Sequence, residues 1–310
     1  MANNKNQNYN DLGLDTRSQP DGYRALNKDG SFNVLKKNVS FFERLNTFHS
    51  LVSMSWMKFF TVILIVYFSI NLLFATLYLS VGLEHLTGIA GKTLSDKFIE
   101  AFFFSAQTIT TLGYGRVAPI GTLANIVAAA ESMLGLLTFA LGTGLMYGRF
   151  SKPTATIKYS NYAVMAPYQD INGFMFKVVN PKKNQLVEVE VNLTLSMRRM
   201  DSETRDFFTL DVEREKVVFF PTMWTIVHPV NDSSPLQGIS QADLINRDAE
   251  FIVMIKAFDE SFSQTVYSRS SYKAEEIKWG EKFAYLTERK GNGLVIDVSR
   301  IDETYKTDLN

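Results

Sequence analysis

Two long apolar runs constrain the fold of this 310-residue chain more than any other feature. From Phe59 to Leu83, about 25 residues carry no formal charge, which is long enough for a helix to cross the hydrocarbon core of a bilayer. A second run, from Ile120 to Gly148, contains one charged residue, Glu131. The alternative is a pair of buried helices in a soluble protein, which runs of this length disfavour. Two spans place both termini on the same side of the membrane.

The segment between the two runs contains Thr110-Thr111-Leu112-Gly113-Tyr114-Gly115. Glycine reaches positive φ at little steric cost, so glycines on both sides of a tyrosine allow consecutive carbonyl groups to turn the same way. The segment is closely similar to the Thr-Val-Gly-Tyr-Gly filter of potassium channels, in which stacked rings of carbonyl oxygens replace the water around K⁺. A Gly-Tyr-Gly triplet alone is most often a plain turn. Its position between two predicted spans gives the similarity its weight.

Two shorter helices are predicted beside the spans. From Phe41 to Val52, apolar residues recur at helical spacing, which favours an amphipathic helix at the membrane surface over a soluble helix packed on the C-terminal part. Between the spans, Thr93 and Asp96 offer N-cap chemistry for a helix that ends where the Gly-Tyr-Gly segment begins. This helix is too short to span the membrane. We therefore predict a re-entrant helix surrounded by protein and a water-filled pore.

The two ends of the chain have a different composition. Residues 1–35 are rich in Asn, Asp, Gly and Gln, which predicts a flexible tail. After Pro153, strand patterns prevail, and apolar and polar residues alternate from Val187 to Met197. The further predicted elements are strands at 156–164, 173–179, 216–220, 223–228, 250–257, 263–269, 283–288 and 293–299, a helix at 240–247 and a hairpin turn at 290–293. Many short strands with one brief helix predict a β-sandwich.

The overall composition excludes several other classes of protein. The net charge is zero, so nothing indicates a nucleic-acid partner, and the absence of cysteine excludes disulfides and thiolate chemistry. The three histidines are scattered, without a nucleophile elbow, a metal-ligand spacing or a P-loop, so an enzyme is not expected. A nucleotide-gated channel with a Rossmann domain would need Gly-x-Gly-x-x-Gly after Pro153, which does not occur. We expect no cofactor, and no metal beyond permeant K⁺.

Taken together, these elements resemble a prokaryotic inward-rectifier potassium channel (KirBac type) over roughly residues 33–300. Besides the filter, the resemblance rests on segments at 55–56, 102–108, 149–153, 224–229, 232–236, 269–272 and 277–280. It implies a homotetramer that conducts K⁺ passively in the bacterial inner membrane, with both termini cytoplasmic. The terminal flanks of the two spans carry more Lys and Arg than the segment between them, which also favours this orientation. The implied domains are the tail 1–35, the interfacial helix and transmembrane α-helical pore domain 36–152, and a cytoplasmic immunoglobulin-like β-sandwich 153–310.

The resemblance also implies roles for residues around the filter. The K⁺-binding filter would consist of Thr111, Leu112, Gly113, Tyr114 and Gly115, and its support of Gln107, Thr110, Arg116 and Glu131. Gln107 stands where the family has a bracing carboxylate, so a full Glu–Arg brace with Arg116 is absent. Leu112 replaces the usual Val or Ile. For Glu131, an ionisable group within a span, we expect a position behind the filter and a hydrogen bond to it.

Four residues of the second span match gating positions of the family. Gly135 matches the hinge glycine, and close helix packing is the equal alternative. Gly144 could serve either role. Phe139 stands where strong rectifiers place an acid, which predicts weak block by polyamines. Tyr147 matches the bulky residue that closes the inner-helix bundle, and an interfacial aromatic anchor is the alternative.

Basic residues near the membrane face are candidates for binding anionic lipid headgroups. They are Lys58, Arg149, Lys152 and Lys158, and the alternative is the ordinary basic flank of a span. Lipid, pH, Mg²⁺ and a metabolite all remain open as the gating stimulus. The rival interpretation of the whole chain is a membrane-anchored β-sandwich binding module with a non-conducting, pore-like anchor.

Overall fold

The computed structural model describes residues 22–35, 37–38, 40, 47–152, 156–182, 184–200, 204–220, 223–291 and 293–310. Residues 1–21 of the predicted tail and 41–46 of the predicted interfacial helix lie outside the described residues. The chain divides into two compact units: one combines Met1–Lys36 with Pro153–Asn310, and the other is Lys37–Lys152. The N-terminal residues thus group with the C-terminal part of the chain.

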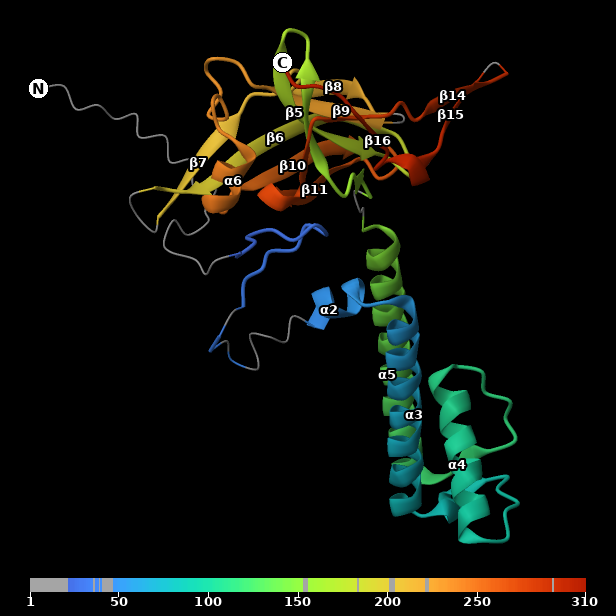
Figure 1. Cartoon of the computed structure of the whole chain (residues 1–310). Helices are drawn as coiled ribbons and strands as arrows, with labels where there is room; N and C mark the ends of the chain where they lie inside the picture. The colour runs from blue at the N-terminus through green and yellow to red at the C-terminus, as the bar shows by residue number, and fades with distance from the viewer. Residues whose placement is uncertain are drawn as a thin grey trace, which may run out of the picture. The chain divides into compact units, whose positions relative to one another are not determined.

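The unit Lys37–Lys152 is helical (Figure 1). Its helices are α2 (Thr47–Ser53), α3 (Trp56–Val81), α4 (Leu94–Ile109) and α5 (Gly121–Phe150). Within the described residues, α3 and α5 are the two helices that are long and apolar enough to cross a membrane. They contact each other along the unit, and both contact α4. The two predicted spans are confirmed, each within a few residues of its expected ends.

Helix α4 begins and ends where the sequence predicts. The hydroxyl of Thr93 accepts a hydrogen bond from the Asp96 amide at 3.2 Å, and the Asp96 carboxylate accepts one from the Thr93 amide at 3.1 Å. This reciprocal cap satisfies two amides that the first helical turn leaves without partners. The buried positions of α4 recur at helical spacing and face the two spans; they are Ala101, Phe104, Ser105 and Ile109. The helix ends directly before the Gly-Tyr-Gly segment.

The other unit is a β-sandwich of two five-stranded sheets. The first sheet has the order β11-β10-β6-β7, with β8 also paired to β6; the bounds are β6 (Leu186–Arg198), β7 (Arg205–Leu210), β8 (Lys216–Phe219), β10 (Glu250–Asp259) and β11 (Gln264–Lys273). The second has the order β12-β4-β5-β3, with β9 also paired to β5; the bounds are β3 (Lys158–Tyr159), β4 (Ala163–Tyr168), β5 (Ile171–Val179), β9 (Met223–Pro229) and β12 (Ile277–Trp279).

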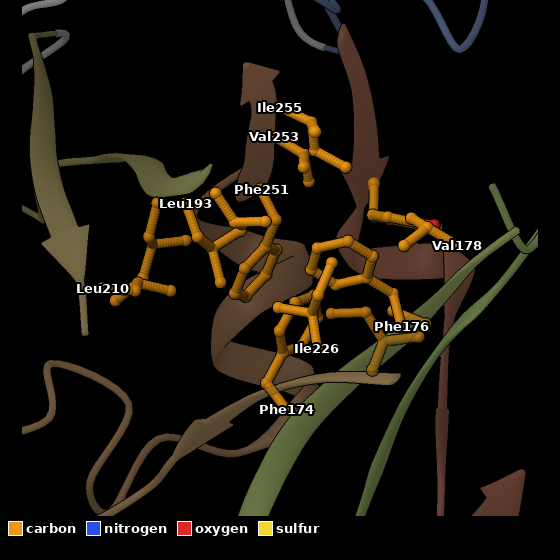
Figure 2. Packing of buried hydrophobic residues seen from close by; sticks show 14 of the residues in the cluster. Phe174, Phe176, Val178, Leu193, Leu210, Ile226, Phe251, Val253 and Ile255 are labelled. Carbon is orange, nitrogen blue, oxygen red and sulfur yellow. The ribbon is translucent and has the colours of Figure 1, made fainter. Parts of the chain in front are cut away.

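The core of the sandwich lies between the two sheets. The ring of Phe174 from β5 stacks on that of Phe251 from β10, with centroids 4.1 Å apart (Figure 2). Ile226 of β9 and Leu193 of β6 belong to the same buried cluster. Burial of such large apolar side chains from both sheets is the main favourable term in folding of this domain. The predicted β-sandwich is confirmed.

Several strand boundaries differ from the predictions. The strand expected at 283–288 is wrong, because the chain instead forms β13 (Glu281–Phe283) and β14 (Thr287–Lys290) with an irregular stretch between them. These two strands pair with different partners, β16 (Thr304–Lys306) and β15 (Gly293–Ile296). The predicted hairpin at 290–293 is confirmed by the pairing of Lys290 with Gly293. The strand predicted at 156–164 is divided between β3 and β4, and β7, β12 and β16 of the sandwich were not predicted, nor were the short strands β1 (Leu86–Thr87) and β2 (Ala118–Pro119) of the helical unit. Helix α6 (Gln241–Asn246) matches its prediction.

The flexible tail predicted for residues 1–35 is wrong for residues 24–26, which pack on the sandwich. The carboxylate of buried Glu250 accepts hydrogen bonds from the amides of Ala25 and Leu26 at 2.9 and 3.1 Å. Arg24 forms an ion pair with Glu276 at 2.8 Å. The side chain of Leu26 is buried. These partners lie more than 200 positions along the chain, so the local composition of the segment does not reveal them.

Candidate functional site

The backbone angle φ alternates in sign along the Gly-Tyr-Gly segment. Thr111, Gly113 and Gly115 have φ values of 58°, 54° and 79°, whereas the intervening residues Leu112 and Tyr114 are not in the left-handed region. Such alternation allows successive carbonyl groups to face the same side of an extended chain. For Thr111, a β-branched residue, this conformation is strained and persists only when the surroundings enforce it. Strain of this kind is concentrated at functional sites.

Contacts with the end of α4 hold this backbone in place. The carbonyl of Gln107 accepts hydrogen bonds from the amides of Leu112 at 2.8 Å and Gly113 at 3.3 Å. The amide of Thr111 donates to the carbonyl of Thr108 at 3.0 Å, and the hydroxyl of Thr110 donates to that of Ala106 at 2.6 Å. The support that we expected from Gln107 therefore comes from its backbone. The structure places Gln107 and Thr110 at the start of the segment, and their role as support of a filter stays a prediction.

Glu131 lies in a buried polar cluster that joins α3, α4 and α5. Its carboxyl group is hydrogen-bonded to the hydroxyl of Tyr78 at 2.7 Å and to that of Ser105. Ser105 is in turn 3.0 Å from Oδ1 of Asn71. All four side chains are buried. The hydrogen bonds of Glu131 thus reach the Gly-Tyr-Gly segment only indirectly, through the helix that precedes it, which corrects the direct bond we expected.

Gly135 lies against the end of α4. A Cβ atom at Gly135 would be 2.3 Å from the carbonyl oxygen of Ile109, closer than real Cβ contacts. The absence of a side chain therefore allows the second span to approach the residue just before the filter segment. This contact supports the close-packing role of Gly135, and its role as a hinge stays a prediction. By contrast, a Cβ at Gly144 meets no atom within 4 Å.

Phe139 and Tyr147 have exposed side chains in the single chain, as have Leu112 and Tyr114 of the filter segment. Large apolar groups exposed on a span face either lipid or another protein surface. The pore-facing roles predicted for Phe139 and Tyr147 require further copies of the chain, so they stay predictions.

Arg149 is engaged inside the helical unit. Its guanidinium donates to the carbonyls of Leu51 and Met54 at 2.5 and 2.7 Å, and lies 4.4 Å from the centroid of the Trp56 ring. These contacts fasten the C-terminal end of α2 to the end of α5 and engage both terminal nitrogens of the guanidinium, while its Nε is buried. A lipid-binding role for Arg149 thus conflicts with its contacts.

The other basic candidates are distributed over both units. Lys58 is exposed at the start of α3, and the ammonium group of Lys152 donates to the hydroxyl of Ser53 at 2.8 Å. Lys158 belongs to the sandwich, where it donates to the carbonyl of Val298 at 3.1 Å. Lipid binding by these three residues stays a prediction.

An ion pair that the sequence analysis did not predict lies near the Gly-Tyr-Gly segment. Arg116 lies 3.4 Å from the carboxylate of Glu100, a residue near the start of α4. The other carboxylate oxygen of Glu100 accepts a hydrogen bond from the amide of Ala90 at 2.9 Å. The spacing of these residues gave no signal, because Glu100 lies two helical turns before Gln107. Asn71 and Tyr78 were also missed, since an uncharged polar residue does not interrupt an apolar run.

Two spans with a re-entrant helix and a strained Gly-Tyr-Gly segment between them form the pore-domain architecture of an ion channel. Comparison with protein families agrees, since residues 61–151 match the family model described as "Ion channel". Residues 157–310 match the model described as "Inward rectifier potassium channel C-terminal domain".

Curated relatives give the same assignment. The inward rectifier potassium channel Kirbac3.1 of Paramagnetospirillum magnetotacticum is 34% identical over 264 residues, covering 84% of this chain and 88% of its own. ATP-sensitive inward rectifier potassium channel 12 of Gallus gallus is 32% identical over 67% of this chain and 52% of its own length. A solved structure of the sporulation control protein Spo0M from Bacillus subtilis matches with a TM-score of 0.21 and 10% identity, over 41% of this chain and 50% of its own, which carries no argument. The chain belongs to the inward rectifier potassium channel family. It is therefore a membrane protein of an ion-channel family and not an enzyme.

Proposed function

We propose that this chain forms a homotetrameric pore that conducts K⁺ passively, with Thr111–Gly115 as its selectivity filter. The observation that carries the proposal is the alternating handedness of Thr111, Gly113 and Gly115 beside the end of a re-entrant helix. Four copies are required because one segment supplies only one side of each ring of carbonyl oxygens. The C-terminal end of α4 directs partial negative charge towards the same region, which favours a cation.

The gate of this channel is proposed at the second span and the membrane face. Tyr147 narrows the bundle of four inner helices, and anionic lipid headgroups bind Lys58 and Lys152, with Lys158 as a further candidate on the sandwich. In this proposal Arg149 joins α2 to α5, so that a movement of α2 at the lipid surface reaches the inner helix. Both termini are cytoplasmic, and the membrane is the bacterial inner membrane.

Ion flux into liposomes tests the proposal. The purified chain is reconstituted, and uptake of Rb⁺ is compared with that of Na⁺, with and without Ba²⁺, while the mass of the detergent-solubilised particle reports the number of subunits. We expect Rb⁺ uptake that Ba²⁺ blocks, from a particle of four chains. Equal Na⁺ and Rb⁺ uptake would contradict a selective filter around Leu112. No uptake from a folded tetramer in any lipid mixture would favour the membrane-anchored binding module instead.

A further inference from the structure

The buried cluster around Glu131 has too few hydrogen-bond donors for all its contacts to be hydrogen bonds if Glu131 is ionised. The amide group of Asn71 donates from Nδ2 to the carbonyl of Tyr67 at 2.7 Å, which leaves Oδ1 facing Ser105. An amide oxygen only accepts hydrogen bonds. The hydroxyl of Ser105 must therefore donate its single hydrogen to Asn71. A hydroxyl has one hydrogen to give, so it has none left for Glu131.

The contact between Ser105 and Glu131 then needs a hydrogen from Glu131. The Oε1 atom of Glu131 is within hydrogen-bond distance of Oγ of Ser105, and Oε2 is 2.7 Å from the hydroxyl of Tyr78. If Glu131 were ionised, two acceptors would face each other in a buried site, which costs the full desolvation of an unpaired group. Exchanging the oxygen and nitrogen of the Asn71 amide does not remove this conflict, because Oδ1 of Asn71 would then face the carbonyl oxygen of Tyr67, which is also an acceptor.

Two further observations disfavour an ionised carboxylate at this position. Glu131 is fully buried, and within the described residues no ion pair includes it. A buried carboxyl group without a cationic partner becomes neutral in preference to carrying a charge, above all at membrane depth.

We infer that Glu131 is a protonated carboxylic acid that donates to Ser105 and so closes a one-way chain of hydrogen bonds through three helices. The chain runs from Tyr78 of α3 to Glu131 of α5, then to Ser105 of α4, and returns through Asn71 to the Tyr67 carbonyl of α3. Along this path Glu131, Ser105 and Asn71 each accept one hydrogen bond and donate one, while the Tyr78 hydroxyl begins the chain as a donor and the Tyr67 carbonyl ends it as an acceptor. Successive hydrogen bonds of the same direction also polarise one another.

Glu131 is therefore a positioning residue for the filter, a role that rests on the proposed function. Ser105 is two residues before Gln107, whose carbonyl holds the amides of Leu112 and Gly113. The chain of hydrogen bonds fixes α4 against both spans. It thereby fixes the position of the Gln107 carbonyl, which accepts the hydrogen bonds of the filter backbone. Glutamine has nearly the same shape as a protonated glutamic acid and likewise offers one acceptor oxygen and a donor at the other position, with one N–H more, so it can replace Glu131 in this chain.

Infrared spectroscopy of the full-length protein in liposomes at neutral pH tests the protonation directly. We expect the C=O stretching band of a protonated carboxylic acid in the native protein, its loss in Glu131→Gln, and its retention in the matched control Glu100→Gln. Loss of an ionised-carboxylate band in Glu131→Gln, with no change in the acid band, would overturn the inference. This measurement needs no ion conduction, so its result is independent of whether the proposed channel function holds.

Rescue by the isosteric variant tests the positioning role. Glu131→Gln is expected to keep the Rb⁺/Na⁺ uptake ratio within about two-fold of the native ratio, whereas Glu131→Ala lowers it by about ten-fold or more, the scale of an unsatisfied buried hydrogen bond. If Glu131→Ala does not assemble, the comparison of the uptake ratio of Glu131→Gln with that of the native protein still tests the positioning role. A Glu131→Gln variant that assembles but has lost its selectivity would contradict the role.

Discussion

The guanidinium carbon of Arg149 lies 4.4 Å from the centre of the Trp56 ring, while two of its nitrogens donate to carbonyls at the end of α2. The first contact is with the start of the first span, and Arg149 itself ends the second. One side chain thus fastens three helices at the membrane face. Only an arginine can make all these contacts at once, because its planar guanidinium donates hydrogen bonds in several directions and also stacks on an aromatic ring.

Arg149→Lys is therefore expected to release α2 although it keeps the charge. Deuterium exchange of the backbone amides in Thr47–Ser53 should rise by about ten-fold or more, because charge-assisted hydrogen bonds contribute roughly 1.5–3 kcal/mol each. Hydrogen-exchange mass spectrometry measures this change, with Arg214→Lys, an exposed arginine of the sandwich, as the control. Unchanged exchange in α2 would mean that its packing holds without Arg149.

Gly135→Ala distinguishes close packing from a hinge. The added Cβ would push the Ile109 carbonyl away from α5 and disturb the filter next to it, so we expect a lower Rb⁺/Na⁺ uptake ratio. Gly142→Ala is the matched control on the same helix, since a Cβ there meets nothing within 4 Å of the single chain. Were Gly135 only a hinge, the alanine variant would open less often in single-channel recordings but remain selective.

The pair of Glu100 and Arg116 should influence conduction more than stability. The pair is partly exposed and its atoms are 3.4 Å apart, so its loss should cost about 0.2–1 kcal/mol at most. Glu100→Gln would leave the charge of Arg116 unbalanced beside the filter of each subunit. We expect a lower single-channel K⁺ conductance at low ionic strength and a native value at high salt, where the field is screened. A conductance deficit that salt does not remove would exclude this electrostatic origin.

Phe139→Asp should convert weak polyamine block into strong block. The native side chain offers no charge to a polyamine, and an acid repeated around the pore would attract one. Recordings with micromolar spermine on the cytoplasmic side would show steep, voltage-dependent block of outward current in the variant alone. Steep block of the native channel would show that another site binds the polyamine.

Lys177 makes the stability of the sandwich depend on pH. Burial lowers the pKa of Lys177 from 10.5 to about 8, and the charge of Glu303 opposes this shift only in part. The folded state therefore binds fewer protons than the unfolded state between pH 8 and 10.5, so stability should rise with pH across that window.

Lys177→Met should abolish this rise and stabilise the domain near neutral pH, by on the order of 2 kcal/mol. Denaturant unfolding of the full chain measures both effects, followed by the fluorescence of Trp224 and Trp279 in a Trp56→Phe background. A native protein whose stability does not change between pH 8 and 10.5 would contradict the lowered pKa.

The features that could be predicted from the sequence are those encoded by neighbouring residues. The spans, the cap of α4 and the hairpin at Lys290 each follow from a pattern within one window of the chain. The filter was predicted by similarity to a known segment, and its positive φ values at Gly113 and Gly115 follow from the glycines themselves.

What could not be predicted depends on residues brought together by the fold. The partners of Glu131 come from two other helices, and Tyr78 and Ser105 are unremarkable polar residues within apolar segments. Arg149 was assigned to lipid because it belongs to a cluster of basic residues at the predicted membrane face. Its real partners, the carbonyl groups at the end of α2, carry no side-chain signal at all.

The docking of the N-terminal segment determines the order in which this protein can be completed. Arg24 and Glu276 are 252 positions apart, so their contact cannot form until most of the chain has left the ribosome. Contacts between such distant residues form late, because a long loop must close first. Both spans and most strands of the sandwich lie between these two residues, so they are synthesised before Arg24 can meet its partner. The segment around Arg24 is thus among the last parts of the sandwich unit to reach its native position.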